Sequence, residues 1–488
     1  MQEATYSPGP GRRPVQRDGD LVCDICVIGA GSAGLSVAAG AVQMGASVVL
    51  VEKGEMGGEC LNSGCVPSKA IIAAAAKAHL PRTSAAFGVT LGPAAVDHQQ
   101  VHDHIASVIA AIAPHDSVER FEGLGVDVIK ASARFVDPRV VEAGGRRIRA
   151  RRFVIATGSR PAVPSVPGLA DSGFLTNETI FTLTALPADL LIMGGGPIGV
   201  EMAQAFRRLG STVTLIEKET ILSRDDPQAV AVVRDALIAD GVAILEGQGV
   251  ASVSRSGDRV EVLLDGGDRI SGTDLLVATG RRPNLEDLGL EAAGIATGPR
   301  GITVDARLRT TNRRVFAIGD VTGGPLFTHA ASQQAGIVIR NALFLLPAKA
   351  DYGALPRVTY TDPELAQVGM TEQEARKSGE PVEVLFAPFA GNDRAQAARR
   401  TEGFAKIIVG RRGRILGATI VGPGAGELIG LWALAMSQRL AIGAVAGLVL
   451  PYPTLSEISK RAAGSYYTPR LFGPTTRRLV GLIQRFVP

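Results

Sequence analysis

The sequence is poor in aromatic residues and in cysteine. Aromatic side chains make up 5% of its 488 residues, and it contains one tryptophan. Surfaces on which bases could stack are therefore scarce, and the formal net charge of +4 is spread along the chain, so nucleic-acid binding is not expected. Four cysteines in a chain of this length do not make a disulfide scaffold. They instead raise the question of whether one pair has a special role.

A secretory signal and a long unbroken apolar run are also lacking. Residues 1–20 are polar, with three arginines and no apolar core, and are expected to form a disordered leader. The most apolar late stretch, residues 428–450, is interrupted by Ser437, Gln438 and Arg439, which makes it too polar to span a bilayer comfortably. We therefore expect a cytoplasmic protein.

The chain is long and rich in glycine. A chain of 488 residues exceeds what one hydrophobic core usually supports, which predicts two to four domains. The 59 glycines and 46% hydrophobic residues are typical of a packed α/β protein with many tight turns.

One sequence unit occurs twice. The segment ICVIGAGSAG at residues 25–34 returns as LLIMGGGPIG at residues 190–199, 165 positions later. The same offset relates MGASVVLVEK at residues 44–53 to LGSTVTLIEK at residues 209–218. Each copy reads as a strand, a glycine-rich turn, a helix and a second strand that ends in an acid.

The glycine spacing of both copies, G-x-G-x-x-G, is typical of dinucleotide sites. The first glycine makes the tight turn, the second lets backbone approach a pyrophosphate, and the third lets the helix pack on the strand. A single such motif is often an ordinary turn, but two with spaced acids predict two dinucleotides, FAD and NAD(P)H. The glycines are Gly29, Gly31 and Gly34 for FAD and Gly194, Gly196 and Gly199 for NAD(P)H, with the ribose-binding acids Glu52 and Glu217.

A second duplicated element follows each copy. VIATGSRP and VATGRRPN place Thr157 and Gly158 at the first site and Gly280 at the second. The first copy is longer between its two elements, and its extra length holds Cys60, Cys65 and a predicted helix over residues 67–80.

The first pair of cysteines, Cys23 and Cys26, lies in the apolar run that enters the first glycine turn. Residues three apart on a regular strand face opposite sides and lie roughly 10 Å apart. A disulfide between them is out of reach, so we expect two small core residues.

The second pair, Cys60 and Cys65, lies in GGECLNSGCVPSK. Residues five apart in a regular helix point about 140° away from each other, so a bond between them needs an irregular entry, which Gly64 allows. Pro67 fits a first-turn position and places Cys65 at a helix N-terminus, where the dipole and Lys69 favour a thiolate. The alternative is a pair of buried, unreactive thiols.

Taken together, GAGSAG, GGECLNSGCVPSK, VIATGSRP, GGGPIGVE, TNRRVFAIGD and PYPTLSE resemble flavoprotein disulfide reductases, the class that includes dihydrolipoamide dehydrogenase, glutathione reductase and mercuric reductase. The resemblance runs from about residue 20 to residue 464. It implies a homodimeric α/β protein with two Rossmann-like dinucleotide-binding domains and a C-terminal α+β dimerisation domain. The implied divisions are a leader (1–20), FAD domain (21–160 and 284–350), NAD(P) domain (161–283), dimerisation domain (351–465) and tail (466–488).

The resemblance also implies roles for single residues. Cys65 would be the flavin-facing, charge-transfer thiol and Cys60 the interchange thiol that meets substrate. Lys69, near the flavin, would pair with Glu201. The alternative for Glu201, and for Asp320 named below, is helix surface charge or turn capping. The further implied FAD contacts are Lys53, Gly58, Asp320 at the ribityl chain, and Thr328 and His329 against the isoalloxazine ring.

One departure from the family pattern concerns the acceptor. Disulfide-reducing members carry H-P-T-x-x-E, supplied by the partner subunit, whereas PYPTLSE has Tyr452 in place of the histidine and Glu457 five residues later. A phenol with a pKa of about 10 is a poor proton shuttle at neutral pH. Mercuric reductase has a similar tyrosine, but it also has a C-terminal cysteine pair, absent from LIQRFVP, and a tyrosine where this chain has Phe174.

Charge and periodicity add two further expectations. Glu217 would accept from the 2′-OH of NADH and repel the 2′-phosphate of NADPH, so NADH is favoured although Lys218 and Arg224 lie nearby.

In the tail, apolar residues recur at helical spacing among arginines, which predicts a helix that packs on its own protein or, as the alternative, touches a membrane. The tail residues concerned are Leu479, Leu482, Ile483 and Phe486, with Arg477, Arg478 and Arg485.

These observations predict an FAD-dependent NAD(P)H oxidoreductase. Electrons would pass through a Cys60–Cys65 disulfide to a disulfide, metal ion or other electrophile, with no resident metal site. The alternatives are a lipoamide dehydrogenase subunit of a multienzyme complex and a reductase of quinones or oxygen at the flavin.

Overall fold

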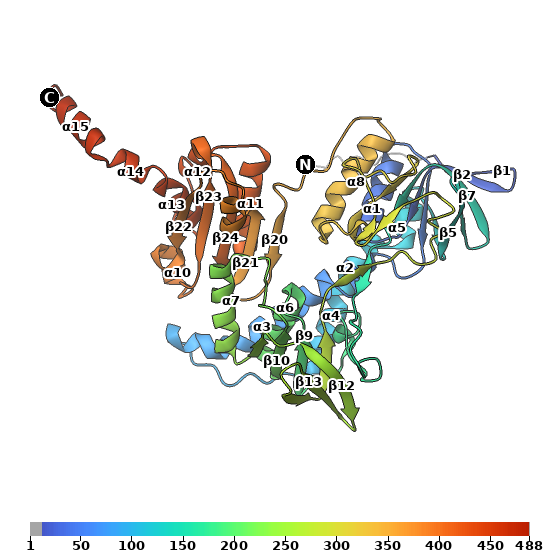
Figure 1. Cartoon of the computed structure of the whole chain (residues 1–488), viewed down its shortest axis with the longest axis horizontal. Helices are drawn as coiled ribbons and strands as arrows, with labels where there is room; N and C mark the ends of the chain where they lie inside the picture. Colours follow the sequence, from blue (N-terminus) through green and yellow to red (C-terminus); the bar gives the residue numbers. More distant parts are fainter. Residues whose placement is uncertain (1–11, 488) are drawn as a thin grey trace, which may run out of the picture.

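A computed structural model describes residues 12–487, which form three lobes and a projecting tail (Figure 1). The first lobe is built on an eight-stranded sheet in the order β4-β3-β2-β7-β6-β5, with β1 added to β2 and β19 to β7. Its strands are β1 (Val15–Arg17), β2 (Asp20–Ile28), β3 (Val48–Glu52), β4 (Asp127–Lys130), β5 (Ala133–Asp137), β6 (Val140–Ala143), β7 (Arg146–Ile155) and β19 (Val315–Ala317).

Strands β2, β3, β4, β7 and β19 are parallel, which explains the continuous apolar runs of β3 and β19 and of the last residues of β2 and β7. One face of this sheet packs on α1 (Ser32–Gln43) and α8 (Thr328–Ala342), whose small residues allow a close approach. β19 and α8 come from far along the chain, so the first lobe is made of two separated segments (Figure 1).

Two expectations for the start of the chain need correction. Disorder is expected over residues 1–20, but β1 pairs with β2, because the turn at Asp18 and Gly19 closes a hairpin. Residues 1–11 lie outside the described part. Cys23 and Cys26 are both buried, as expected, yet they pack in one hydrophobic cluster rather than on opposite faces. The strand is irregular between them, where the backbone N–H groups of Asp24 and Ile25 both donate to one carbonyl.

The second lobe repeats the same plan with fewer strands. Its parallel sheet has the order β11-β10-β9-β15, and a three-stranded antiparallel sheet, β12-β13-β14, packs beside it. The bounds are β9 (Asp189–Met193), α6 (Pro197–Leu209), β10 (Thr212–Glu217), α7 (Pro227–Asp240), β11 (Ala243–Glu246), β12 (Val250–Ser256), β13 (Arg259–Leu264), β14 (Arg269–Gly272) and β15 (Asp274–Val277).

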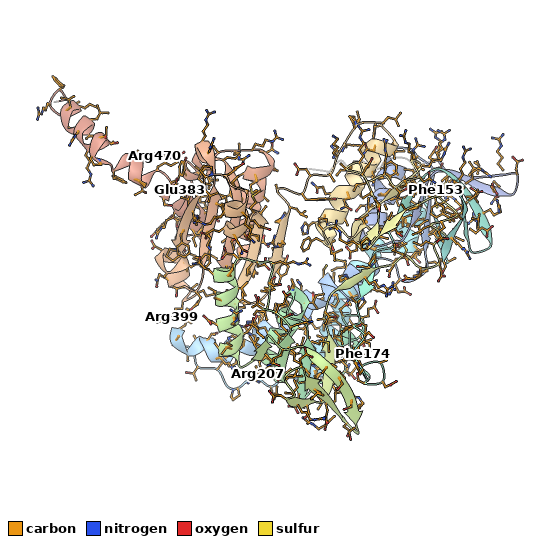
Figure 2. All side chains as sticks on the ribbon, viewed as in Figure 1. Phe153, Phe174, Arg207, Glu383, Arg399 and Arg470 are labelled. Carbon is orange, nitrogen blue, oxygen red and sulfur yellow. The ribbon has the colours of Figure 1, made fainter. Side chains whose placement is uncertain are left out.

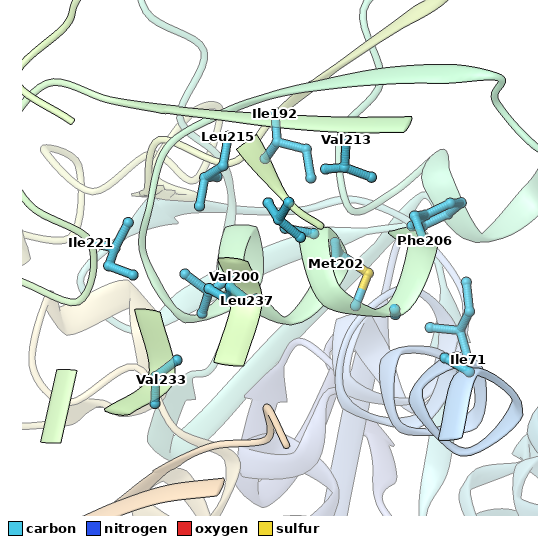
Figure 3. Close-up of a cluster of buried hydrophobic side chains, with 14 of the residues drawn as sticks. Ile71, Ile192, Val200, Met202, Phe206, Val213, Leu215, Ile221, Val233 and Leu237 are labelled. Carbon is cyan, nitrogen blue, oxygen red and sulfur yellow. The ribbon is translucent and has the colours of Figure 1, made fainter. Parts of the chain in front are cut away.

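The extra segment of the first copy forms helices that reach into the second lobe. These are α2 (Gly58–Asn62), α3 (Cys65–Ser84), α4 (His98–Ile112) and α5 (Val118–Gly123). α3 begins two residues before and ends four residues after the predicted 67–80. Ile71 on α3 shares a buried cluster with Met202 and Phe206 of α6 (Figure 3). The helix that carries one cysteine is therefore fixed against the second dinucleotide unit.

The third lobe is an antiparallel sheet covered by helices. Its strands run in the order β20-β21-β24-β23-β22, and Trp432 on α11 is fully buried beneath them, with its indole N–H donating to Ser459 Oγ at 3.1 Å. The bounds are β20 (Pro356–Thr359), β21 (Glu364–Gly369), α9 (Glu372–Lys377), β22 (Glu383–Pro388), α10 (Asp393–Ala397), β23 (Phe404–Val409), β24 (Ile415–Gly422), α11 (Ala425–Ser437), α12 (Ile442–Ala446) and α13 (Glu457–Ser465).

The third lobe is docked on the second through a buried ion pair. Lys406 Nζ lies 2.8 Å from Asp226 Oδ2, and both side chains are almost completely buried. Asp226 also caps α7, so one carboxylate serves a helix end and a lobe contact. The predicted α/β class, with two Rossmann-like units and a C-terminal α+β lobe, is confirmed.

The tail differs from expectation. α14 (Thr468–Leu471) and α15 (Pro474–Ile483) are helical, but neither contains a buried residue. The expectation that this helix packs on its own chain is therefore wrong for the described residues, in which α15 extends away from the third lobe (Figure 1). None of the helices in the described part is long and apolar enough to cross a membrane.

Candidate active site

The two cysteines of the insertion lie on adjoining short and long helices. Cys60 is half-buried in α2, and Cys65 is the first residue of α3. Gly64 forms the joint between them. A Cβ at this position would lie 3.0 Å from the Glu59 carbonyl oxygen and 3.3 Å from the Cys60 Cα, so the close approach of the helices depends on glycine. The irregular helix entry predicted for this pair is confirmed.

The two thiols differ in acidity because they are hydrogen bonded to each other. The bond from Cys60 lowers the pKa of Cys65 to about 6, helped by the Thr328 hydroxyl and the Lys69 charge against the effect of burial. The same bond and burial raise the pKa of Cys60. The Thr328 Oγ1 lies 3.4 Å from the Cys65 Sγ. These opposite shifts favour the thiolate form at Cys65 and the protonated form at Cys60.

Lys69 forms the ion pair predicted for it. Its Nζ lies 2.7 Å from Glu201 Oε2, and the Glu201 side chain is only 6% exposed. The other carboxylate oxygen of Glu201 accepts from the Tyr360 backbone N–H at 2.9 Å, and Lys69 also lies over the Tyr360 ring. This pair joins the dithiol helix α3 to α6 of the second lobe, so Glu201 is neither a surface charge nor a turn cap.

The first glycine turn has the shape of a pyrophosphate cradle. A Cβ on Gly34 would lie 1.8 Å from the Gly29 carbonyl oxygen, and one on Gly29, which has φ +105°, would lie 2.4 Å from the Ala156 carbonyl oxygen. Gly31 is open, with nothing nearer than the Gly58 Cα at 3.9 Å, and α1 starts directly after it without a side-chain cap. These free N–H groups fit the diphosphate of FAD.

The second turn repeats this geometry. A Cβ on Gly199 would lie 1.9 Å from the Gly194 carbonyl oxygen, and nothing lies within 4 Å of one on Gly196. α6 also starts without a side-chain cap. The residues fit the diphosphate of a nicotinamide dinucleotide in the same way.

The acids that end β3 and β10 brace these turns. Glu52 Oε2 accepts from the Ala30 backbone N–H, and Glu217 Oε2 accepts from the Gly195 backbone N–H, each at 2.6 Å. The sequence pattern does not predict this second partner for the acid; the ribose contacts of both acids remain predictions. Lys53, predicted beside them, is exposed at the end of β3.

The dithiol segment lies directly on the first turn. Gly31 and Gly57 form a parallel bridge, and a Cβ on Gly58 would lie 2.6 Å from the Gly31 Cα. Gly58 therefore has a structural reason to be glycine beyond a cofactor contact. Cys60 comes two residues later, so the fold places the dithiol beside the dinucleotide cradle.

A polar network that the sequence did not predict holds α2, the short helix that carries Cys60. Arg281 Nη groups donate to both carboxylate oxygens of Glu59, next to Cys60, and Arg281 Nε lies 3.4 Å from Asp320 Oδ2. Burial raises the pKa of Glu59 against the opposing effect of Arg281. Asn177 Nδ2 donates to Glu59 Oε1 at 2.7 Å. Asp320, predicted from FAIGD, is thus linked to the segment that carries Cys60.

The duplicated ATG elements meet each other. Strands β8 (Ser159–Pro161) and β16 (Arg281–Pro283) pair antiparallel where the chain crosses between the first and second lobes. The Thr157 hydroxyl donates to the Asn284 carbonyl at 2.9 Å, so this predicted cofactor residue ties the two crossings together. Gly158 and Gly280 both have positive φ at these crossings. A signal was present in the sequence, since the repeat itself marks both strands.

The other predicted residues fall in two places. Thr328 begins α8 beside Cys65, and His329 stacks on Phe327 with its Nε2 2.8 Å from the Pro356 carbonyl oxygen. Phe174 instead packs with the core of the second lobe (Figure 2).

Tyr452 and Glu457 lie just before and at the start of α13, which belongs to the third lobe and lies away from α2 (Figure 1). Tyr452 is 70% exposed, and its hydroxyl donates to Asp393 Oδ2 at 2.9 Å, which raises the pKa of the phenol. Glu457 begins α13. Within one chain, residues 12–487 show neither of them in contact with the cysteines, nor any group of three metal-binding side chains suited to hold a metal ion.

Comparison with known proteins gives two family matches. The pyridine nucleotide-disulphide oxidoreductase profile matches residues 23–335, and the dimerisation domain of the same class matches residues 355–463. A mercuric reductase from Staphylococcus aureus is 35% identical over 476 residues, 95% of this chain and 87% of the relative. A dihydrolipoyl dehydrogenase from Geobacillus stearothermophilus is 36% identical over 449 residues, 90% of this chain and 94% of the relative.

A solved structure is similar over nearly its whole length. The Cu(II) complex of the HOCl-induced flavoprotein disulfide reductase RclA from Escherichia coli matches with a TM-score of 0.83 and 29% identity, covering 91% of this chain and 99% of that chain.

Proposed function

We propose a function from one premise: the chain belongs to the pyridine nucleotide-disulphide oxidoreductase family. It is an FAD-dependent oxidoreductase driven by NAD(P)H. We further propose the identity of the electron acceptor, the preferred nucleotide and the oligomeric state. The acceptor is a thiophilic metal ion, the nucleotide is NADH, and the enzyme is a homodimer.

Cys60 and Cys65 are the proposed acceptor-binding groups. The first glycine turn would hold FAD, which would supply two-electron transfer between the nicotinamide and the dithiol. Cys65 is held as a thiolate by the hydrogen bond from Cys60, and Cys60 loses that proton when both sulfurs bind a cation. Lys69, held by Glu201, adds positive charge that keeps Cys65 ionised. The pair is thus suited to soft cations, which prefer thiolate ligands.

The choice of acceptor rests on Tyr452, whose hydroxyl donates a hydrogen bond to the Asp393 carboxylate. Reduction of a disulfide by NADH consumes one proton overall, because two thiols form. Reduction of a divalent metal ion to the metal releases one, because NADH and the ion give NAD⁺, a proton and the reduced metal. The Asp393 carboxylate raises the pKa of Tyr452 above its usual value near 10, so the phenol stays protonated and does not shuttle protons at neutral pH. Metal-ion reduction does not need that shuttle.

The test compares acceptors on one enzyme. NADH oxidation is followed with Hg(II) buffered by excess thiol, with Cu(II), and with lipoamide, for the wild type and for Tyr452→His. We expect turnover with a metal ion and little with lipoamide, with lipoamide activity rising in Tyr452→His. Brisk lipoamide turnover by the wild type, without metal-ion turnover, contradicts the metal-ion proposal.

Disulfide reduction is the second candidate. It is favoured by the 36% identity to a dihydrolipoyl dehydrogenase and by Glu457, which stands where the family pattern has an acid. Retained turnover of quinones or oxygen by Cys60→Ser would instead favour a reaction at the flavin.

The homodimer proposal rests on the dimerisation-domain match at residues 355–463. It also explains why Tyr452 and Glu457 lie far from their own dithiol, since the partner subunit would bring its copies to it. Analytical ultracentrifugation of the holoenzyme tests this directly, and a monomer at micromolar concentration argues against it.

The NADH proposal rests on Glu217. Its carboxylate ends β10 and accepts from two backbone N–H groups, so a negative charge is fixed beside the second turn. A 2′-phosphate placed there would be repelled. We expect kcat/KM to favour NADH, and the preference to shrink in Glu217→Ser; equal values for both nucleotides in the wild type count against the proposal.

A further inference from the structure

The tail after α13 is a separate feature that the redox site does not use. α14 and α15 leave the third lobe without a single buried residue, and Arg470 marks the point of departure (Figure 2). Large apolar side chains are exposed along it: Leu479 55%, Val480 50%, Leu482 52%, Ile483 47%, Phe486 80% and Val487 52%. Exposed apolar groups at this density indicate an interaction surface.

The apolar side chains of α15 itself lie on one face. At about 100° per residue, its four large apolar residues, Leu479, Val480, Leu482 and Ile483, fall within an arc of roughly 160°. The complementary arc holds Arg477, Arg478 and Gly481. Arg477 lies near one edge of that polar arc and Arg478 near the other, so cationic groups flank both sides of the apolar face.

The charge of the tail has one sign. From Tyr466 to Val487 the sequence has no aspartate or glutamate, while four side chains are basic. They are Arg470, Arg477, Arg478 and Arg485. Across the described chain, the acids that form ion pairs reach none of the arginines of α14 or α15, whereas several arginines in the lobes, such as Arg146, Arg149 and Arg208, have such partners. The tail therefore keeps its positive charge for an outside partner.

We propose that α15 docks in the surface of an anionic lipid bilayer and tethers the enzyme there. Its apolar face would enter the boundary between headgroups and acyl chains, and the flanking arginines would reach the lipid phosphates. α15 has 10 residues, about 15 Å of helix, so it lies in the interface and does not span it. The proposal does not depend on the electron acceptor.

A bilayer fits better than a second copy of the chain. A protein partner would have to pair several arginines with acids while also covering the large apolar side chains. In one leaflet of an anionic membrane the phosphates lie beside the acyl chains, so the apolar arc can face the acyl chains while the flanking arginines reach the phosphates.

The experiment is cosedimentation of the full-length holoenzyme with vesicles. Vesicles of phosphatidylcholine with one third phosphatidylglycerol should bind the protein, and pure phosphatidylcholine vesicles should bind at least about tenfold less. Binding should fall at least about tenfold between 0.05 and 0.5 M NaCl.

Ile483→Glu and Gln484→Glu form a matched pair. They add the same charge to neighbouring exposed positions, but only Ile483 lies in the apolar arc. We expect Ile483→Glu to reduce binding at least about tenfold, and Gln484→Glu to reduce it less than about threefold. NADH oxidation by both variants should equal that of the wild type, which verifies folding.

Three outcomes overturn the proposal. One is no binding to the anionic vesicles. Another is an equal loss of binding in both variants, which would mean that vesicle binding depends on net charge and not on the apolar face. The third is dissociation of a larger assembly by Ile483→Glu without lipid binding by the wild type, which makes the apolar face a contact between chains.

Discussion

The two dinucleotide units of this chain have closely similar glycine turns, yet the segments after their second strands differ. The first glycine of each has φ near the same value, +105° at Gly29 and +111° at Gly194. A Cβ on the third glycine would approach the carbonyl of the first to 1.8 Å in one unit and 1.9 Å in the other. Each unit also has a glutamate that accepts from the turn at 2.6 Å. The backbone geometry of the glycine turns therefore does not distinguish the two units.

The difference lies in the insertion. In the first unit the chain passes from β3 through Gly57 and Gly58, which pack on Gly31, into the two cysteine-bearing helices. In the second unit α7 leads directly from β10 to β11, and Gly196 is left open. The same scaffold thus occurs twice, and only its first copy carries the inserted cysteine-bearing helices.

The largest expected effect comes from removing the chemistry of the insertion. Cys60→Ser and Cys65→Ser should each reduce metal-ion-dependent NADH oxidation by about a thousandfold or more, because neither single thiol can hold the acceptor as a dithiolate. The measurement is steady-state NADH oxidation at equal FAD content. Cys23→Ala, a buried cysteine outside the insertion, is the control and should retain activity.

Replacing the third glycine by alanine should disrupt the two dinucleotide units independently of each other. Gly34→Ala and Gly199→Ala both drive a Cβ into a backbone carbonyl, which should cost about 3 kcal/mol in the free energy of unfolding. Gly34→Ala should lose FAD, measured as flavin absorbance per chain. Gly199→Ala should keep FAD and raise KM for NADH.

Gly196→Ala is the control for folding in this comparison, since a Cβ there meets nothing within 4 Å. Its urea midpoint should be unchanged, although its KM for NADH should rise because the dinucleotide approaches that backbone. Loss of FAD in Gly199→Ala would show that the two units are not independent.

The link between the insertion and the second unit can be tested through the Lys69 and Glu201 pair. Lys69→Met leaves a buried carboxylate without its cation and should lower the free energy of unfolding by about 2 kcal/mol. Lys69→Met combined with Glu201→Gln should recover part of the loss, and urea unfolding of all four proteins gives the coupling. Additive losses would mean that the pair does not couple the units.

The smallest expected effect concerns the acidity of Cys65. Its thiolate fraction rises with pH through a pKa of about 6, so alkylation by iodoacetamide in the reduced enzyme should reach half its maximal rate near pH 6. Cys60→Ala removes the largest cause of the shift, and the midpoint should move upward. Peptide mass spectrometry separates Cys65 from the buried Cys23 and Cys26, and an unchanged midpoint would contradict the assigned cause.

Much of the site was accessible from the sequence because its signals are local or repeated. The glycine spacing, the irregular joint at Gly64 and the helix start at Cys65 each depend on neighbours a few residues away. The pairing of Lys69 with Glu201 came instead from family resemblance, since no local rule joins residues 132 positions apart. Arg281 was missed, although it lies in the second ATG element, because its role depends on where Glu59 lies.

The sequence by itself determined the α/β class, the two glycine turns and the irregular helix entry between Cys60 and Cys65. These depend on backbone conformation and on spacing within short segments. Tertiary structure decided what those segments meet: Cys23 and Cys26 on one side of an irregular strand, β8 against β16, and α15 away from every lobe. Such contacts depend on residues far apart in the chain, and their energies are set by packing and burial, which no local pattern specifies.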